Sequence, residues 1–147
     1  MNVRLSGADA PDAAGVDAAA LGRAGERLLA ALDLRGAELS VALVGEAAMA
    51  ELNARWRGRE GPTDVLSFSL LEGEGAEHRG GLLGDVVLCV PVAVRQAAAR
   101  GHGVDEELLR LLVHGTLHLL GHDHQHDDEA AVMEAEERRL WQVLHAG

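Results

Sequence analysis

The sequence is poor in aromatic residues, with no tyrosine, one phenylalanine and two tryptophans among its 147 residues. Apolar residues still make up 48% of the chain, which is enough for one domain whose core is built from leucine, valine and alanine. Cys89 is the only cysteine, so an intramolecular disulfide is excluded, and its apolar neighbours predict a buried position.

Lysine is also absent, so all 13 basic side chains are arginine, and the net charge is −11. This charge argues against a general attraction to a phosphate backbone. It does not exclude a nucleic acid as substrate, because a bound metal and a few arginines can create a local positive site. No apolar run is long enough to span a membrane, and the first ten residues lack the apolar core of a signal peptide. We therefore expect a cytoplasmic protein.

The spacing of apolar residues predicts an α+β fold. Residues 1–147 are expected to form a single domain, with a small mixed sheet of about four strands packed by about five helices. The strands are predicted at residues 3–5, 39–43, 65–68 and 82–90, the last interrupted by Gly84-Asp85. The helices are predicted at residues 17–32, 46–56, 91–100, 105–120 and from Asp127 or Asp128, as the cap, to 144.

The predicted helix at residues 105–120 is apolar over most of its circumference, which indicates a buried central helix. The last helix is expected to turn Val132, Met133, Leu140, Trp141 and Leu144 inward. Its acidic residues, among them Glu134, Glu136 and Glu137, are interpreted as a solvated face.

Three histidines in the segment from His114 to His124 form the most informative pattern. His114 and His118 are four residues apart on the buried helix, so a rotation of about 400° brings both imidazoles to nearly the same face. His124 can join them only if the helix ends first, and Gly121 permits that turn. Three imidazoles with one open position are typical of a catalytic zinc site.

Other interpretations of these residues remain open. Histidines on an apolar helix can be hydrogen-bonded core residues, although burying several of them unpaired would be costly. His122 and His126 compete with His124 as the third ligand. Asp123 is a candidate partner for the free N–H of a ligand.

Two familiar zinc chemistries fit poorly. The spacing of His114, His118, Gly121 and His124 matches a metzincin protease, but those enzymes need a glutamate directly after the first histidine, where this chain has Gly115. A zinc deaminase needs a Pro-Cys-x-x-Cys signature, which a single cysteine cannot supply.

The segment His114-Gly115-Thr116-Leu117-His118-Leu119-Leu120-Gly121-His122-Asp123-His124 resembles the signature of the YbeY family of bacterial metal-dependent endoribonucleases. Three further stretches agree in order and spacing, and together the resemblance covers residues 41–144. They are Asn53-x3-Arg57-Gly58, the block Thr63-Asp64-Val65-Leu66-Ser67-Phe68, and Leu83-Gly84-Asp85.

The resemblance implies one zinc ion per chain, held by His114, His118 and His124, with Arg57, His114 and His118 carrying catalysis. It also implies an α+β fold, a single-stranded RNA substrate, maturation of small-subunit ribosomal RNA ends and ribosome quality control. The expected partners are ribosomal RNA and ribosomal proteins, with no DNA and no membrane. The chain departs from the family at His122, usually tyrosine, and at Ser69, usually proline.

As a mechanism, zinc would lower the pKa of a bound water, which would attack a phosphodiester. Arg57 would bind the phosphate, because a guanidinium matches its oxygens. Arg55 and Arg59 complete the densest basic cluster of the chain, and a solvated loop is the alternative interpretation. His122 and Asp123 are candidate general acids. Asp64 and Asp85 would either orient the site or serve as turn residues.

Two alternative functions remain. One is a zinc-stabilised ribosome-associated factor without nuclease activity. The other is a zinc protease that lacks the usual glutamate.

Overall fold

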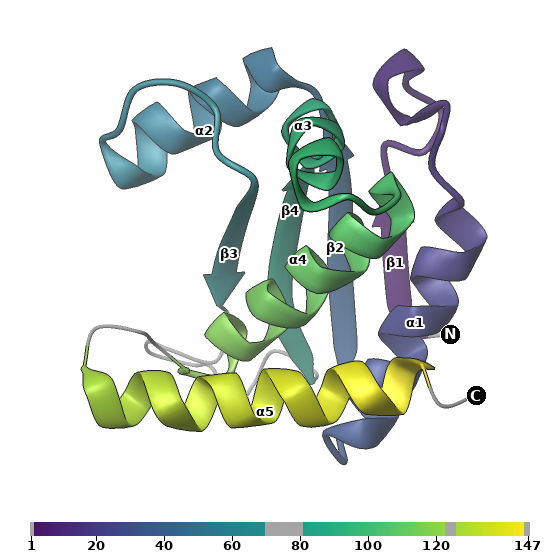
Figure 1. Ribbon diagram of the computed structural model, residues 1–147, viewed down its shortest axis with the longest axis vertical. Helices are drawn as coiled ribbons and strands as arrows, with labels where there is room; N and C mark the ends of the chain where they lie inside the picture. Colours follow the sequence, from purple (N-terminus) through teal and green to yellow (C-terminus); the bar gives the residue numbers. More distant parts are fainter. Residues whose placement is uncertain (1, 70–80, 123–125, 146–147) are drawn as a thin grey trace.

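Four strands form one mixed sheet in the order β1-β2-β4-β3 in the computed structural model, which describes residues 2–69, 81–122 and 126–145. The strands are β1 (Val3–Ser6), β2 (Glu38–Val44), β3 (Val65–Ser69) and β4 (Leu82–Cys89). β1, β2 and β4 run parallel, and β3 pairs antiparallel with β4 at one edge (Figure 1). This confirms the expected small mixed sheet and the α+β class.

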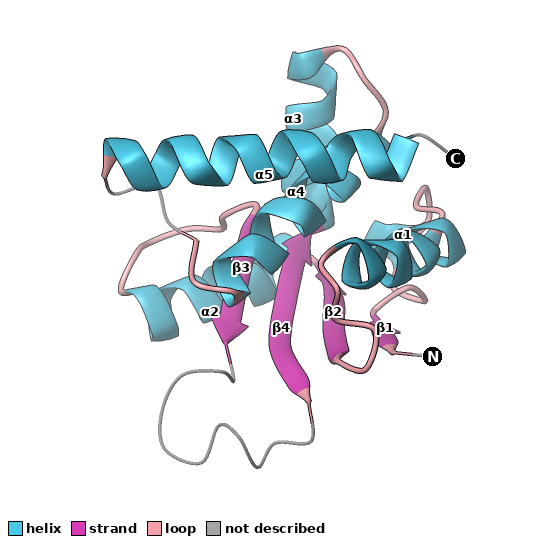
Figure 2. Ribbon diagram, turned by 90° about the horizontal axis from the view of Figure 1, so that it is seen from below, coloured by secondary structure: helices cyan, strands magenta, loops and turns pink. Residues whose placement is uncertain are grey.

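Five α-helices and one short 3-10 helix surround this sheet in the described part of the chain. They are η1 (Pro11–Ala13), α1 (Ala18–Ala31), α2 (Glu46–Arg57), α3 (Val90–Arg100), α4 (Val104–Leu119) and α5 (Asp127–His145). α4 lies between the sheet and α5, as Figure 2 shows, and α2 lies on the opposite side of the sheet. α4 is therefore the buried central helix that its leucine-rich sequence predicts.

The core has two parts, one on each face of the sheet. The larger part fills the space between the sheet and helices α1, α4 and α5, and leucines dominate it. The smaller part lies under α2 and includes Met49, Leu66, Val87 and Cys89. Cys89 is fully buried, as its neighbours predict. Within the described residues, no helix combines the length and apolar character needed to cross a membrane.

Three local expectations are wrong. Gly84 and Asp85 do not interrupt β4, which runs on through a bulge in which Leu82 pairs with Glu38 and Gly84 with Leu39. Gly84 has a φ of +147°, and a Cβ there would lie 2.2 Å from the Phe68 carbonyl oxygen, so the bulge requires glycine.

The other two corrections concern α5. The helix begins at Asp127, so Asp127 and Asp128 occupy its first turn and do not precede it as a cap. Val132 does not face inward, because 60% of it is exposed, whereas Met133, Leu140 and Leu144 are buried as expected.

A glycine sets the distance between α4 and the sheet. A Cβ at Gly115 would lie 2.8 Å from Val86 Cγ1 and 3.1 Å from both Ser67 Oγ and Val65 Cγ2. The hydroxyl of Ser67 donates to the Gly115 carbonyl at 2.8 Å, and that of Ser69 donates to the Leu119 carbonyl at 3.1 Å. The backbone of α4 therefore rests directly on β3 and β4.

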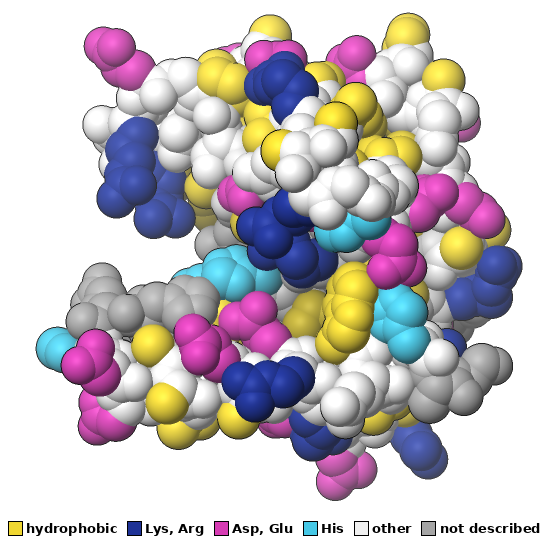
Figure 3. Space-filling model, viewed as in Figure 1, with side chains coloured by type: hydrophobic (Ala, Val, Ile, Leu, Met, Phe, Trp, Pro, Cys, Tyr) yellow, Lys and Arg dark blue, Asp and Glu magenta, His cyan; other side chains and the backbone are white. Residues whose placement is uncertain are grey.

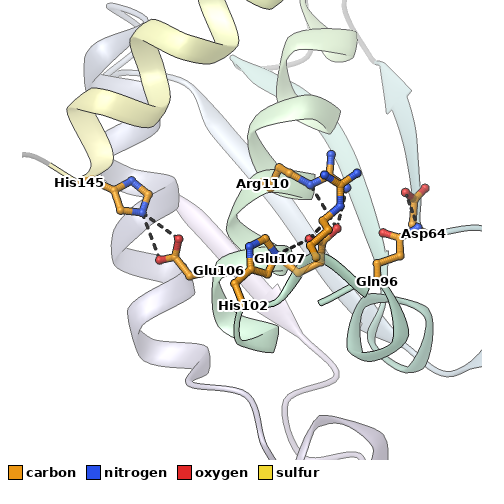
Figure 4. A network of polar contacts seen from close by, with 8 residues as sticks. Asp64, Gln96, His102, Glu106, Glu107, Arg110 and His145 are labelled. Atoms are coloured by element: carbon orange, nitrogen blue, oxygen red, sulfur yellow. Dashed lines mark hydrogen bonds and ion pairs between the residues drawn. The ribbon is translucent and has the colours of Figure 1, made fainter. Parts of the chain in front are cut away.

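Glu107 forms a buried ionic network at the start of α4 (Figure 4). Its carboxylate lies 2.6 Å from Arg110 Nη2, 2.6 Å from His102 Nε2 and 3.6 Å from Arg100 Nε. Burial alone would raise the pKa of Glu107, but hydrogen bonds from Arg110 and His102 outweigh it and hold that pKa below its usual value. The network stabilises the turn between α3 and α4.

We expect Gly115→Ala to lower the free energy of unfolding by about 1–3 kcal/mol, because the added methyl group overpacks the contact with the sheet. Gly22 on α1 is a matched control, since a Cβ there meets nothing within 4 Å. Gly22→Ala should raise the free energy of unfolding by about 0.4–1 kcal/mol. Urea denaturation in the presence of a metal chelator measures both. Equal effects of the two substitutions would contradict the close contact.

Glu107→Gln should lower the free energy of unfolding by about 1–3 kcal/mol at pH 7. Because folding lowers the pKa of Glu107, its carboxylate stabilises the protein above the unfolded pKa of about 4.3, and this contribution is lost as the pH falls through the folded value. The difference between wild type and variant in urea denaturation should therefore shrink at acidic pH. The exposed Glu51 is the control, and Glu51→Gln should change stability by less than about 0.5 kcal/mol. A pH-independent difference would disprove the ionic role of Glu107.

Candidate active site

A cleft of about 650 Å³ lies between the C-terminal half of α4, strand β3 and the segment that follows α2. Figure 3 shows the hollow on the left of the molecule, with basic side chains above it and histidine on its wall. Its lining includes Asn53, Arg57, Arg59, Glu60, Asp64, Ser67, Ser69, His114, His118 and His122. The structure thus brings Arg57 and two of the predicted metal ligands to one cavity.

His114 and His118 point their Nε2 atoms at each other from successive turns of α4. These atoms are 3.1 Å apart, and the rings meet edge to face with centroids 4.6 Å apart. Two imidazole nitrogens bound to one tetrahedral zinc ion at about 2.0–2.1 Å would be separated by about 3.3 Å. The observed separation fits a shared metal ion, so the chemistry and the spacing of this pair suit zinc.

The third predicted ligand, His124, lies outside the described residues, as does Asp123. In the part of the chain that the structure describes, no group of three or more His, Cys, Asp or Glu side chains is arranged to hold a metal ion. His122 lines the cleft, whereas His126 is exposed at the start of α5 and is not among the lining residues. A third donor at position 124 therefore stays a prediction.

Gly121 ends α4 in the way its sequence position predicts. Its φ is +95°, its N–H donates to the His118 carbonyl at 3.0 Å, and the N–H of His122 donates to the Leu117 carbonyl at 3.1 Å. This pair of bonds is the Schellman motif, in which a residue in the left-handed region turns the chain back across the helix end. The turn directs the chain toward the cleft immediately after the two histidines.

Glu137 on α5, which does not line the cleft, approaches the Nδ1 atom of His114. Its Oε1 atom lies 3.7 Å from His114 Nδ1, and each side chain is about one quarter exposed. The 3.7 Å separation is an ion-pair distance, longer than a hydrogen bond. A carboxylate beside Nδ1 favours the tautomer that carries its proton there, which is the form whose Nε2 can bind a metal. Glu137 thus belongs only in part to a solvated face, and no local sequence signal connects it with a residue 23 positions earlier.

Asn53 shapes the arginine-containing segment that forms the opposite wall. It is buried, its side-chain amide donates to the Gly61 carbonyl at 2.9 Å, and its own carbonyl accepts from the N–H groups of Gly58 and Arg59. Gly58 takes the left-handed conformation that ends α2. Arg57 and Arg59 therefore project from a segment that one buried residue holds at both ends. It does so through its side-chain amide at Gly61 and its backbone carbonyl at Gly58 and Arg59.

The third arginine of this cluster has a different position. Arg55 does not line the cleft, and its guanidinium carbon lies 6.0 Å from the centre of the Trp56 ring. The predicted basic cluster is thus divided between the cleft and the exposed end of α2.

Asp64 serves as a turn residue, which is one of the two roles that the sequence allows, the other being to orient the site. Its Oδ1 accepts from the Val65 N–H at 2.8 Å, and its Oδ2 accepts from Gln96 of α3 at 3.2 Å (Figure 4). It thereby anchors the start of β3, which is a wall of the cleft. Asp85 lies in β4 and is not a lining residue.

Gly115 also bears on the type of chemistry. The position directly after His114 faces the sheet, where a Cβ would clash with Val86. A glutamate there would not reach the cleft as a general base. Among the described lining residues, the carboxylates are Glu60, in the segment after α2, and Asp64, at the start of β3. The protease alternative thus has no support in the geometry of α4.

Comparison with known proteins gives one consistent family. A family model described as endoribonuclease YbeY matches residues 17–145. Relatives named endoribonuclease YbeY include those of Salinispora tropica, 50% identical over 114 residues, and a Sulfurihydrogenibium species, 47% identical over 106 residues. These alignments cover 71% and 72% of this chain, and 72% and 68% of the relatives.

Two further matches extend this result. A Mycobacterium leprae relative with the same name is 49% identical over 110 residues, an alignment that covers 71% of this chain and 62% of the relative. The solution structure of a Thermotoga maritima protein has a TM-score of 0.65 at 26% identity and covers 97% of this chain and 88% of that one.

Proposed function

Because the chain belongs to the endoribonuclease YbeY family, we propose that its cleft is the active site of a metal-dependent endoribonuclease that acts on single-stranded RNA. The observation that carries this proposal is the convergence of His114 and His118 in the same cleft as Arg57 and Arg59. One wall thus offers metal ligands and the other offers phosphate-binding groups, a combination that suits metal-dependent hydrolysis of a phosphodiester.

We propose zinc as the metal, at one ion per chain, with His114, His118 and His124 as ligands. The separation of the two described Nε2 atoms supports this choice. A zinc ion bound there would supply the Lewis acidity that makes a water molecule nucleophilic near neutral pH. The chain itself would then bind the phosphate through Arg57 and orient the His114 ring through Glu137.

The biological setting of the proposal is maturation of small-subunit ribosomal RNA ends and ribosome quality control in the cytoplasm. Ribosomal RNA and ribosomal proteins would be the partners, with no DNA and no membrane. The placement of Arg57 and Arg59 supports an RNA partner, because these exposed arginines create a local positive wall on a chain of net charge −11. The non-catalytic ribosome-factor alternative predicts that RNA is not cut at any metal occupancy.

Arg57→Ala should retain zinc and lose RNA cleavage by about 10²–10³-fold, because it removes a charged donor to the phosphate. The control is Arg23→Ala, an equal charge change at an exposed position on α1 that does not line the cleft. Single-turnover cleavage of a labelled single-stranded RNA measures the rates, and elemental analysis measures the zinc content.

The same assay includes His118→Ala, which should lose both zinc and activity, whereas wild type should hold about one zinc per chain. If residual cleavage in a His118→Ala preparation matches wild type, a contaminating nuclease is responsible and the proposal fails. Undiminished cleavage by Arg57→Ala would remove Arg57 from the mechanism.

Glu137→Gln should weaken zinc binding by about 10- to 100-fold, because the amide cannot hold the Nδ1–H of His114 as a carboxylate does. Glu134→Gln, one turn earlier on α5, is the matched control and should bind zinc as wild type does. Competition with a chromophoric chelator measures the affinities, and circular dichroism verifies folding. A Glu137→Gln affinity within twofold of wild type would contradict the orienting role.

A further inference from the structure

Trp56 is an exposed aromatic residue next in the chain to the cleft-lining Arg57. It lies in the last turn of α2, directly before Arg57, and 61% of it is exposed. An exposed indole leaves a large apolar surface in contact with water. The chain has only one other tryptophan and one phenylalanine, so few other large aromatic side chains are available to its core. Phe68 packs against the smaller hydrophobic cluster, whereas Trp56 is not among the residues that do so. Packing of the core therefore does not account for Trp56.

Two contacts hold the indole in place. Its ring meets Phe68 edge to face, with centroids 6.1 Å apart and an interplanar angle of 72°. The guanidinium of Arg55 lies 6.0 Å from the ring centre. A ring oriented by its neighbours loses little rotational freedom when a flat ligand stacks on it, and the nearby cation attracts an anionic ligand.

The position of Trp56 connects it with the cleft. Consecutive Cα atoms are 3.8 Å apart, so Trp56 and the cleft-lining Arg57 are immediate neighbours. Neither Trp56 nor its contact Phe68 lines the cleft. Phe68 lies in β3 between the cleft-lining Ser67 and Ser69, and alternation along the strand turns it to the opposite face, under α2. Trp56 therefore lies outside the cleft, next to the edge strand β3. Figure 1 shows this end of α2 extending past β3, and Figure 3 shows the basic side chains gathered there.

The surface around Trp56 is complementary to a nucleic-acid strand. Arg55, Arg57 and Arg59 are all exposed, within five residues of one another, on a chain with a net charge of −11. Proteins that hold single strands combine such basic groups, which follow the backbone, with aromatic rings on which unpaired bases stack. Paired bases inside a duplex do not offer a free face to such a ring.

We propose that Trp56 is a stacking platform for an unpaired base of the RNA, next to the phosphate at Arg57, and that it favours single strands over duplexes. This inference rests on the proposed endoribonuclease function and identifies a specificity determinant for its substrate. Arg55 supports the platform by its charge. The base leaves the ring when the strand pairs, so the contact distinguishes the two forms of RNA without reading sequence.

The test is equilibrium binding of a labelled 2′-O-methyl single-stranded oligonucleotide to the zinc-loaded protein, with electrophoresis to verify that the strand stays intact. Trp56→Ala should weaken single-strand binding by about 5- to 150-fold, the range of base stacking on an aromatic ring. Trp56→Phe should stay within about threefold of wild type, since it keeps an aromatic face. Binding of the matched duplex should be equal in all three proteins.

Fluorescence gives an independent measurement. In Trp141→Phe, Trp56 is the only tryptophan, and the single strand should quench its emission while the duplex should not. Equal binding by Trp56→Ala and wild type, with no quenching, overturns the platform while leaving the nuclease proposal intact. Loss of binding in both Trp56 variants without quenching also overturns it, since the effect then comes from packing against Phe68. If wild-type protein neither binds nor cleaves single-stranded RNA, the nuclease proposal itself fails.

Discussion

The direct contact between α4 and the sheet at Gly115 determines the geometry of the whole site. Without a Cβ at this position, the helix backbone comes within hydrogen-bond reach of Ser67 and Ser69 on the edge strand β3. His114 and His118 flank this contact along the helix, so their rings emerge at the edge where the cleft opens. A larger side chain at position 115 would push the helix away from the strand. The two walls of the cavity would then move apart.

Much of this arrangement could be predicted from local sequence. The helix that carries His114 and His118 follows from its leucine spacing, and the turn at Gly121 follows from the conformational freedom of glycine. These features depend on residues a few positions apart, so periodicity reveals them. The basic segment around Arg57 could be recognised from its local density of arginine, and the structure places Arg57 and Arg59, but not Arg55, in the same cleft.

The remaining features depend on residues that are distant in the sequence. Glu137 meets His114 only because α5 packs across α4, and a run of acidic residues on a helix gives no sign of such a partner. The local sequence predicts an interruption at Gly84-Asp85, whereas the register of β2 against β4 makes this point a bulge within one strand. Asn53 acts through its backbone carbonyl as much as through its amide, which residue identity alone cannot indicate.

Asn53 has a thermodynamic consequence for any anion that enters the cleft. Because one buried residue closes the segment from Arg57 to Gly61 before a ligand arrives, the backbone there has little conformational entropy left to lose on binding. The phosphate-facing wall is thus preorganised, and only the arginine side chains need to be ordered. The affinity of this wall for an anion therefore depends in part on Asn53, whose contacts with the backbone form without the ligand.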